Sequence, residues 1–290
     1  MRIQHFVFTR FNVRFAFFLE RYGWAGGDSE YLERRFAMFE KYCLPAMKMQ
    51  SVPFRWLVLF SSLTPDKFKD RARSYAGECP SFEAVFVDDA TPIEGSAMQE
   101  TFYRYIEERL DPDAEWVISS RIDNDDAFNV KSLSWIRQSA EESIASGASG
   151  PFFVAVPNGN AWLVDHGFTQ TYSWASNHFP SLVCPRAERR QVMSVNHTKV
   201  KDLGLPIVSN HAEHAWLEIV SGTNLKNAFR PSCPACRMSA RELKELFAID
   251  ADVPRWRSLR FYWTKYLPAR IAWLIRRSLR RFLPWRSAPA

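Results

Sequence analysis

The sequence lacks the features that mark several large classes of protein. No apolar run approaches the roughly 20 residues that cross a bilayer, and polar residues such as Gln4 and Arg10 interrupt the N-terminus too soon for a secretion signal. The five cysteines are an odd number at scattered spacings, which does not indicate a disulfide framework. We therefore expect a cytoplasmic protein.

Two further motifs are missing. Cys233 and Cys236 form a single CxxC, and neither a second pair nor two closely spaced histidines follow, as a structural zinc site normally requires. We interpret this segment as a loop with two reduced thiols. The sequence also has no GxxxxGK[ST] loop, which disfavours a phosphoryl-transfer enzyme of the P-loop type.

Acidic residues are absent from the C-terminal segment. Residues 255–290 contain ten Arg and Lys but no Asp or Glu, whereas the first 254 residues contain 28 basic and 32 acidic residues. The net charge of +6 thus comes from the tail, and the body is net acidic. This distribution argues against a nucleic-acid-binding protein, which needs a basic surface on the body.

The pattern of apolar residues predicts strands that alternate with helices. The expected strands cover residues 5–11, 54–60, 82–87, 115–120 and 151–156, and the expected helices cover 31–50, a segment from Thr64, 95–110, 131–146 and 239–247. Pro45 should kink or restart the first helix. The alternation predicts an α/β fold with a mostly parallel central sheet flanked by helices. We expect one domain over residues 1–250, with an irregular stretch at 158–227 that forms the second half of the site, and a helical tail over 251–290.

Acidic residues gather at the ends of two expected strands. In open α/β sheets, ligands bind beyond the carboxyl ends of the strands. The residues concerned are Asp88, Asp89, Asp123, Asp125 and Asp126. The acidic residues therefore lie where such a sheet places its site.

The segment from Asp123 to Asp126 holds three carboxylates in four residues. Close carboxylates raise one another's pKa unless a cation lies between them. Mg²⁺ and Mn²⁺ prefer such oxygen ligands and commonly share them with substrate phosphates. The alternative is an ordinary polar turn after a strand. Because this D-x-D directly follows a Trp-Val-Ile strand and an Arg, we favour a metal site that binds a nucleotide diphosphate.

Several segments resemble the rhamnosyltransferase family of the GT-A fold. Residues 120–127, Ser-Arg-Ile-Asp-Asn-Asp-Asp-Ala, resemble its TR-[LI]-DNDDA signature, and residues 39–45 resemble its FE-x-YCLPS helix. The first and second strands, at 5–13 and 55–60, also match, as do blocks at 181–183, 196–200 and 216–220. Taken together, these matches are more specific than the D-x-D alone.

The resemblance implies a metal-dependent glycosyltransferase with Mn²⁺ or Mg²⁺ as cofactor. The donor would be a nucleotide sugar, with a deoxysugar such as rhamnose, and the acceptor a saccharide or a lipid-linked saccharide. Asp123 and Asp125 would hold the metal and the diphosphate. The other residues expected to bind the donor are Thr9, Arg10, Phe11, Asp88, Asp89 and Arg121.

The sequence departs from the family at two positions. Ser221-Gly222 stands where the family has a His-Gly pair, and Ser61 stands where the second strand often ends in Asp. These changes keep an alternative open, a catalytically inactive GT-A-like binding or scaffold protein of a polysaccharide pathway.

The catalytic base and the histidine ligands are less well defined by sequence. An inverting transfer needs a carboxylate to accept the proton of the acceptor hydroxyl, and the candidates are Asp165, Glu188 and Glu213. His197 and His214 are candidate metal ligands, with His211 as a further substitute for the missing His. The alternative for such loop histidines is a hydrogen-bonded structural role.

The tail has the pattern of a basic amphipathic helix. Between Arg270 and Arg286, the apolar residues fall on one helical face and most arginines on the other. Such helices favour anionic membrane surfaces, which suits a lipid-linked acceptor and a peripheral location at the inner face of a membrane. The alternative is a helix that packs its apolar face on the domain.

Overall fold

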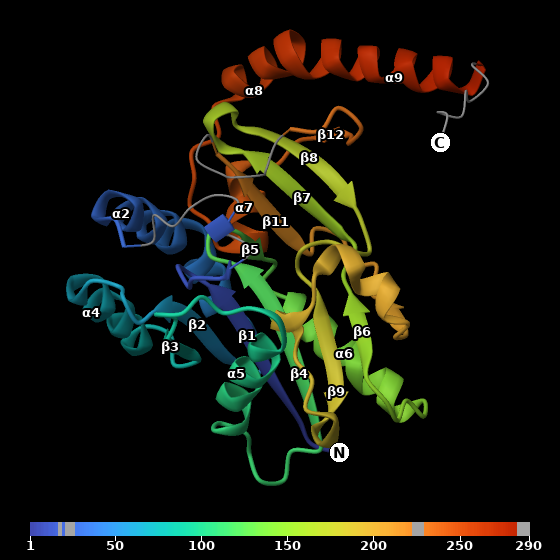
Figure 1. The fold of residues 1–290 in the computed structure, drawn as a ribbon. Helices are drawn as coiled ribbons and strands as arrows, with labels where there is room; N and C mark the ends of the chain where they lie inside the picture. The colour runs from blue at the N-terminus through green and yellow to red at the C-terminus, as the bar shows by residue number, and fades with distance from the viewer. Residues whose placement is uncertain (17–18, 21–26, 222–228, 283–290) are drawn as a thin grey trace.

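The computed structural model describes residues 1–16, 19–20, 27–221 and 229–282. Its core is a seven-stranded sheet in the order β10-β6-β9-β4-β1-β2-β3 (Figure 1). The strands are β1 (Ile3–Arg10), β2 (Arg55–Ser61), β3 (Phe82–Val87), β4 (Trp116–Asp123), β6 (Phe152–Ala155), β9 (Ser181–Pro185) and β10 (Ile207–Ser209). Each neighbouring pair is parallel except the pairs of β9, which runs antiparallel to β4 and β6. The predicted α/β class with a mostly parallel central sheet flanked by helices is confirmed.

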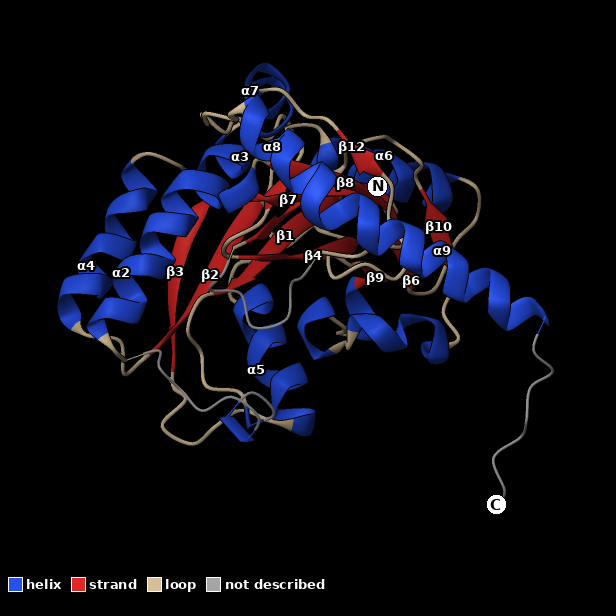
Figure 2. Cartoon of the chain, turned by 90° about the horizontal axis from the view of Figure 1, so that it is seen from above, coloured by secondary structure: helices blue, strands red, loops and turns tan. Residues whose placement is uncertain are grey.

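Helices cover both faces of this sheet (Figure 2). Helices α2 (Ser29–Met38), α4 (Asp66–Ser74) and α6 (Ser132–Ala145) share one apolar cluster with alternate residues of β1, β2 and β4. Helix α5 (Gly95–Glu107) and the short helices η5 (Val192–Ser194) and η6 (His197–Leu203) cover the other face. The period-two alternation of the strands therefore supplies both halves of the core.

A second, five-stranded sheet lies beyond the carboxyl end of the first (Figure 1). Its order is β12-β8-β7-β11-β5, with β5 (Ala127–Phe128), β7 (Asn158–Leu163), β8 (Phe168–Ser173), β11 (Trp216–Val220) and β12 (Ala235–Cys236). Helices α3 (Leu44–Lys48) and α7 (Ala240–Phe247) pack on it. The ring of Trp216 on β11 lies so close to Gly159 on β7 that a Cβ at position 159 would lie 2.1 Å from it. Only glycine, which has no Cβ, leaves room for the ring here.

The expectation of an irregular stretch over residues 158–227 was wrong. Five strands, β7 to β11, lie within it, and two of them complete the central sheet. One of them, β8, does not follow an apolar strand pattern, because it buries the polar residues Thr169 and Gln170. Gln170 satisfies its amide by donating to the carbonyls of Arg230 and Cys233, at 2.7 and 3.1 Å.

The expected restart of the first helix at Pro45 is confirmed. A π turn, η1 (Phe39–Cys43), separates α2 from α3, and Pro45 occupies the first turn of α3. Proline lacks an N–H and clashes with the carbonyl of residue i−4 in a regular helix. The π turn relieves this conflict because it changes the bonding pattern just before the proline.

The chain ends in a helical segment. Helix α8 (Arg255–Phe261), the π turn η7 (Tyr262–Tyr266) and α9 (Leu267–Phe282) follow one another without a break. No helix among the described residues is long and apolar enough to cross a membrane. Residues 283–290 of the predicted tail lie outside the described residues, and the domain boundary at residue 250 stays a prediction.

His5 is a buried titratable group in the central sheet. Its Nε2 lies 2.8 Å from the Ser120 hydroxyl, which in turn lies 2.7 Å from that of Ser181. Burial, and to a lesser extent the charge of Arg137, lowers the pKa of His5 from 6.5 to about 3. The folded protein therefore holds this imidazole neutral where the unfolded chain would protonate it.

We predict that His5 makes the free energy of unfolding depend on pH between 6.5 and about 3. In this range the unfolded chain binds a proton that the folded chain does not, so stability from His5 is full above pH 6.5 and is lost as the pH falls. The free energy of unfolding should then change by about 1.4 kcal/mol per pH unit. Urea unfolding of His5→Gln should show a slope smaller by this amount, whereas His166→Gln, at an exposed histidine, should match the wild type. If the free energy of unfolding depended equally on pH in the wild type and in both variants, the proposed role of His5 would be contradicted.

Candidate metal and nucleotide site

The candidate site forms at the carboxyl end of β4. The strand ends at Asp123, and the chain then turns tightly into β5, with the Asp126 N–H donating to the Asp123 carbonyl at 3.2 Å. Strand β5 pairs with β11 of the second sheet. The turn thus joins the two sheets, and its carboxylates lie where they meet.

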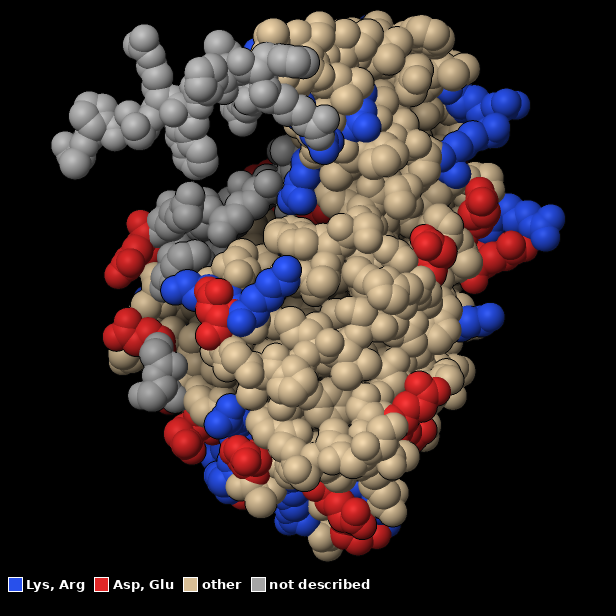
Figure 3. Space-filling view, turned by 90° about the vertical axis from the view of Figure 1, so that its right-hand side faces the viewer, with Lys and Arg blue, Asp and Glu red and all other residues tan. Residues whose placement is uncertain are grey.

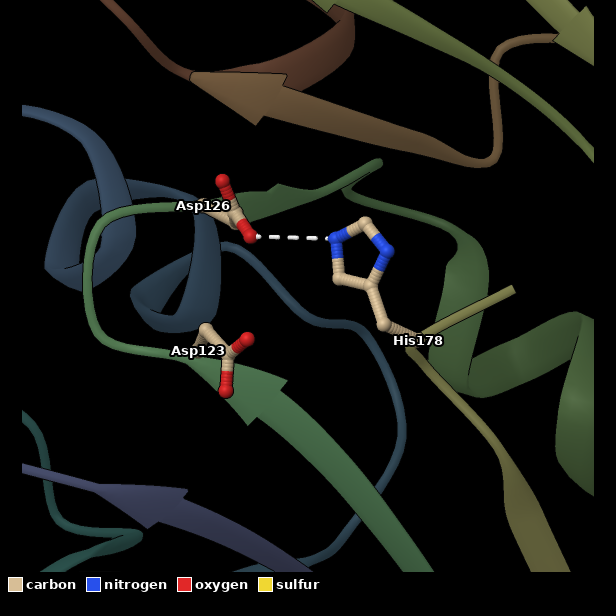
Figure 4. Close-up of side chains that lie close together, drawn as sticks. All are labelled: Asp123, Asp126 and His178. Atoms are coloured by element: carbon tan, nitrogen blue, oxygen red, sulfur yellow. Dashed lines mark ion pairs between the residues drawn. The ribbon is translucent and has the colours of Figure 1, made fainter. Parts of the chain in front are cut away.

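Asp126 and His178 face each other inside the protein (Figure 4). One oxygen of Asp126, Oδ1, accepts from the Ile219 N–H at 2.8 Å. The other, Oδ2, lies 3.4 Å from His178 Nε2. Both of these atoms are buried, and neither has a hydrogen-bond partner in the part of the chain that the structure describes. Two buried polar atoms without partners are costly, which points to a ligand between them.

Asp123 completes this group. Ligand atoms of Asp123, Asp126 and His178 all lie within 4.8 Å of one another. Arg10, at the end of β1, donates to Asp123 Oδ1 at 3.0 Å. The parallel register of β1 and β4 places these two residues side by side. Asp123 is half-buried, so the group opens toward the surface on its side.

The electrostatics of the cluster favour a cation. Burial, and then the charges of Asp125, Asp123 and Glu218, raise the pKa of Asp126 well above its ordinary value. Burial lowers the pKa of His178, so its imidazole is neutral and has a lone pair to offer. Two carboxylates and a neutral imidazole are a donor set for a divalent metal ion. The residues present therefore fit Mn²⁺, and fit Mg²⁺ less well because Mg²⁺ prefers oxygen ligands alone.

Asp125, which was predicted to be a ligand, lies outside this group. Arg35 of α2 donates to Asp125 Oδ2 at 3.0 Å and also to the Asn124 side-chain oxygen. The Asp125–Arg35 ion pair is largely buried, with side-chain exposures of 8% and 17%. Burial opposes the charge on Arg35, but the pKa of the guanidinium is raised because Asp125 lies beside it. The second Asp of the D-x-D thus fixes α2 to the turn.

Residues 25–232 match the family described as "Putative rhamnosyl transferase". The chain belongs to this family. No curated protein matches the sequence.

Several solved structures are similar at low scores. S. aureus TarS in complex with UDP-GlcNAc is 13% identical with a TM-score of 0.30, and the match covers 56% of this chain and 34% of that one. The "putative nucleotide-diphospho-sugar transferase" of Desulfovibrio desulfuricans G20 is 9% identical with a TM-score of 0.33, over 76% and 81% of the two chains. The T. maritima inositol-1-phosphate CTP transferase is 12% identical with a TM-score of 0.36, over 78% and 93%. The chain spans about a third of the length of the TarS chain in complex with UDP-GlcNAc.

The candidate site contains a further carboxylate, Glu218, which the sequence analysis did not select. It lies on β11 and is 3% exposed. Burial raises its pKa, while His178 and Arg230 act in the opposite direction. Its neighbour Ile219 donates to Asp126, so Glu218 stands next to the cluster.

Arg121 joins the loops around the site. It is buried and donates to the carbonyls of His178 and Val195 at 3.2 and 3.4 Å, and its Nη2 lies 3.2 Å from His197 Nδ1. Burial, followed by the charge of Arg10, lowers its pKa to about 10. Arg121 thus holds the segment that carries His178.

His197 and His214 do not belong to the group of Asp123, Asp126 and His178. His197 is half-buried, and burial and the charge of Arg121 lower its pKa to about 4. Its ring centroid lies 6.2 Å from that of His178, so it lines the same region without joining the group. His214 Nδ1 lies 2.6 Å from the Asn160 side-chain oxygen. The histidine of this site is His178.

The residues expected to bind the donor divide into buried and accessible ones. Thr9 accepts from the Trp56 indole at 2.9 Å, and Phe11 packs among the rings of α2 and β2. Their side chains belong to the core. Asp88 is exposed. Arg10 is partly exposed and contacts Asp123.

Asp89 explains one departure from the family. It is fully buried and accepts from the Ser61 hydroxyl and the Arg14 N–H, each at 2.7 Å. A carboxylate at position 61 would face that of Asp89, whereas serine donates to it. Ser61 is therefore consistent with the local structure, and Asp89 is held inside the protein. Gly222 lies outside the described residues.

The three predicted base candidates lie on exposed loops. Asp165 is in η3 (Val164–His166), Glu188 is in η4 (Arg186–Glu188), and Glu213 precedes β11. Glu188 pairs with Arg190 at 3.5 Å, and Glu213 accepts from Asn158 at 3.2 Å. None belongs to the group of Asp123, Asp126 and His178.

One residue that the sequence analysis missed had a detectable signal: Glu218 was the lone charge in the apolar block at 216–220. Asp126 was part of the predicted acidic site but was not singled out as a ligand. A single charge in a buried strand is rarely tolerated without a function or a partner. His178 and Arg35 had no such signal, because each reaches the turn from a distant segment.

We predict that Arg35→Met destabilises the protein far more than Arg34→Met. Removal of Arg35 leaves Asp125 buried without this cation, at a cost of about 3 kcal/mol. Arg34 pairs with Glu30 on the surface, with exposures of 54% and 81%, so its loss should cost less than about 0.5 kcal/mol. Urea unfolding of the two neighbouring variants makes the comparison. Similar losses in both would show that Arg35 does not hold the turn.

Proposed function

We propose that this protein is a metal-dependent glycosyltransferase. It moves a sugar, for which rhamnose is the first candidate, from a nucleotide-diphosphate donor to a saccharide or lipid-linked acceptor. The observation that carries the proposal is the group of Asp123, Asp126 and His178 at the carboxyl end of β4. Two of its buried atoms have no hydrogen-bond partner among the residues that the structure describes. Membership of the rhamnosyl transferase family supports the reaction class.

The charges around the group fit a pyrophosphate. A bound divalent ion supplies positive charge that stabilises the leaving diphosphate. Asp123 and Asp126 would hold the ion through oxygen and His178 through Nε2. Arg10 lies against Asp123 at the half-exposed side of the group, with its side chain 25% exposed, and would contact the diphosphate there. Arg121 positions His178 by binding its backbone carbonyl.

Glu218 is the proposed general base. An inverting transfer needs a carboxylate that accepts the proton of the acceptor hydroxyl. Glu218 lies beside the metal-ligand group, and burial raises its pKa, which makes its carboxylate a stronger base than an exposed one. The exposed positions of Asp165, Glu188 and Glu213 give these residues no comparable environment.

The proposed location is the inner face of a membrane, with the acceptor carried on a lipid. What supports it is the C-terminal segment, which has ten basic residues and no acidic ones over 255–290. The alternative of an inactive scaffold rested on Ser61 and Ser221. The bond from Ser61 to Asp89 removes the first of these grounds, since serine there stabilises the strand ends.

The first test is calorimetric titration with uridine, guanosine and thymidine diphosphates, with and without Mn²⁺. We expect one nucleotide to bind in a way that requires the ion. Asp126→Asn and His178→Asn should each weaken Mn²⁺ binding by at least about tenfold, as expected for loss of a ligand. Asp70→Asn, at an acid of α4 whose side chain is 73% exposed, is the matched control and should bind as the wild type does. Nucleotide binding that is indifferent to Mn²⁺ and to both variants would refute the metal site.

The second test concerns the base. With the nucleotide identified, release of nucleoside diphosphate from the corresponding sugar donor can be followed. Glu218→Gln should lower kcat by about 10²–10⁴-fold while the donor KM stays close to that of the wild type. Asp165→Asn, Glu188→Gln and Glu213→Gln test the other carboxylates under the same conditions. A large fall in kcat in one of these three, with Glu218→Gln active, would reassign the role.

A further inference from the structure

The C-terminal helices are fixed to the body along one side. Phe261 is buried, with its ring centroid 4.9 Å from that of Phe168. The Tyr266 hydroxyl accepts from the Ala235 N–H at 3.0 Å and donates to the Cys233 carbonyl at 3.1 Å. Arg270 donates to the Pro231 carbonyl at 2.8 Å. These contacts determine which side of the segment faces outward.

The outward side carries large apolar side chains. Their exposed fractions lie between 44% and 63%. They are Trp256, Leu259 and Trp263 before or within the π turn η7, and Ile271, Leu274, Ile275 and Leu279 in α9. Scattered exposed apolar residues are normal, but a contiguous set of this size marks an interaction surface. We call these seven residues the outer face.

The π turn aligns the two parts of the outer face. Trp263 and Ile271 are eight residues apart, which in an unbroken α-helix leaves them about 80° apart around the axis. The π turn contains one additional residue, which brings the two to within about 20°. The apolar side chains of α8 and α9 therefore form one row rather than two.

The charges beside this row are all positive. The basic residues of the segment whose side chains the structure describes are Arg255, Arg257, Arg260, Lys265, Arg270, Arg276 and Arg277. Figure 3 shows basic but no acidic side chains at the top of the molecule, whereas both signs occur on the body below. In Figure 1, α9 lies across the top of the molecule above β8 and β12, and its far end extends beyond them. An apolar row with tryptophans and flanking arginines is the pattern of a helix that lies in the interface of an anionic bilayer.

We propose that the outer face of α8, η7 and α9 is a docking surface for an anionic phospholipid bilayer, with Trp256 and Trp263 inserted among the headgroups. Insertion removes the apolar row from water, and the arginines contact lipid phosphates. The uniform charge of the segment opposes pairing of this face with the same face of a second copy.

Docking would also orient the site. Helix α8 packs on β8, and the second sheet continues from β8 through β7 to β11, whose Ile219 N–H binds Asp126. The membrane surface and the metal-ligand group are therefore joined by one rigid sheet. A saccharide on a membrane lipid would meet the site from this side. This last consequence rests on the proposed transfer reaction, whereas docking itself does not.

The test is cosedimentation of the full chain with vesicles of phosphatidylcholine, with and without phosphatidylglycerol, in the absence of nucleotide. We expect binding to the anionic vesicles that weakens as salt is added. Trp256→Ser with Trp263→Ser should lower the partition coefficient at least about tenfold. Arg276→Gln with Arg277→Gln should lower it roughly thirtyfold on anionic vesicles. The matched control, Met49→Ser with Leu63→Ser, removes two exposed apolar residues of the body and should bind as the wild type does.

Circular dichroism and the unfolding temperature establish that each variant is folded. Equal sedimentation of the wild type with both kinds of vesicle, or full binding by the Trp256→Ser/Trp263→Ser variant, would overturn the proposal. A concentration-dependent dimer that this variant abolishes, without vesicle binding by the wild type, would assign the outer face to a second copy instead. The nucleotide titrations are performed on the same proteins, so loss of vesicle binding with intact nucleotide binding separates this inference from the proposed function.

Discussion

The structure depends on how three closely spaced carboxylates are accommodated at the end of a buried strand. Asp123, Asp125 and Asp126 follow one another within four residues, and burial without compensation would make them repel and protonate. Each has a different partner: Arg10 for Asp123, Arg35 for Asp125, and the Ile219 N–H for one oxygen of Asp126. The remaining Asp126 oxygen lies 3.4 Å from His178 Nε2.

This requirement brings separate parts of the chain together. Helix α2 reaches the turn through Arg35, the second sheet reaches it through Ile219, and the loop before β9 reaches it through His178. Arg121 then holds the backbone of that loop from within β4. The contacts that stabilise the acidic turn therefore also hold Arg35, Ile219 and His178 in place around it. The same interactions determine the stability of the turn and the geometry of the site.

The second sheet connects the two functional regions that we propose. At one edge, β5 continues directly from the acidic turn, and near the other edge β8 packs beneath α8. Gly159 permits the close crossing of Trp216 within this sheet. A transferase that takes its acceptor from a membrane needs a rigid connection of this kind, because the distance between lipid surface and donor site must be constant.

The sequence alone determined the α/β class, the parallel strands β1 to β4, the helices between them and the acidic turn, because these depend on local periodicity and on residue types at strand ends. It also determined the basic amphipathic character of the tail. Only the tertiary structure decided that His178 and Glu218 stand beside Asp126, that Asp125 binds Arg35, and that residues 158–227 contain five strands. These features join residues far apart in the chain, and buried polar strands such as β8 follow no simple apolar pattern. The π turn η7, which aligns the outer face, likewise leaves no trace in a helical periodicity of 3.6 residues.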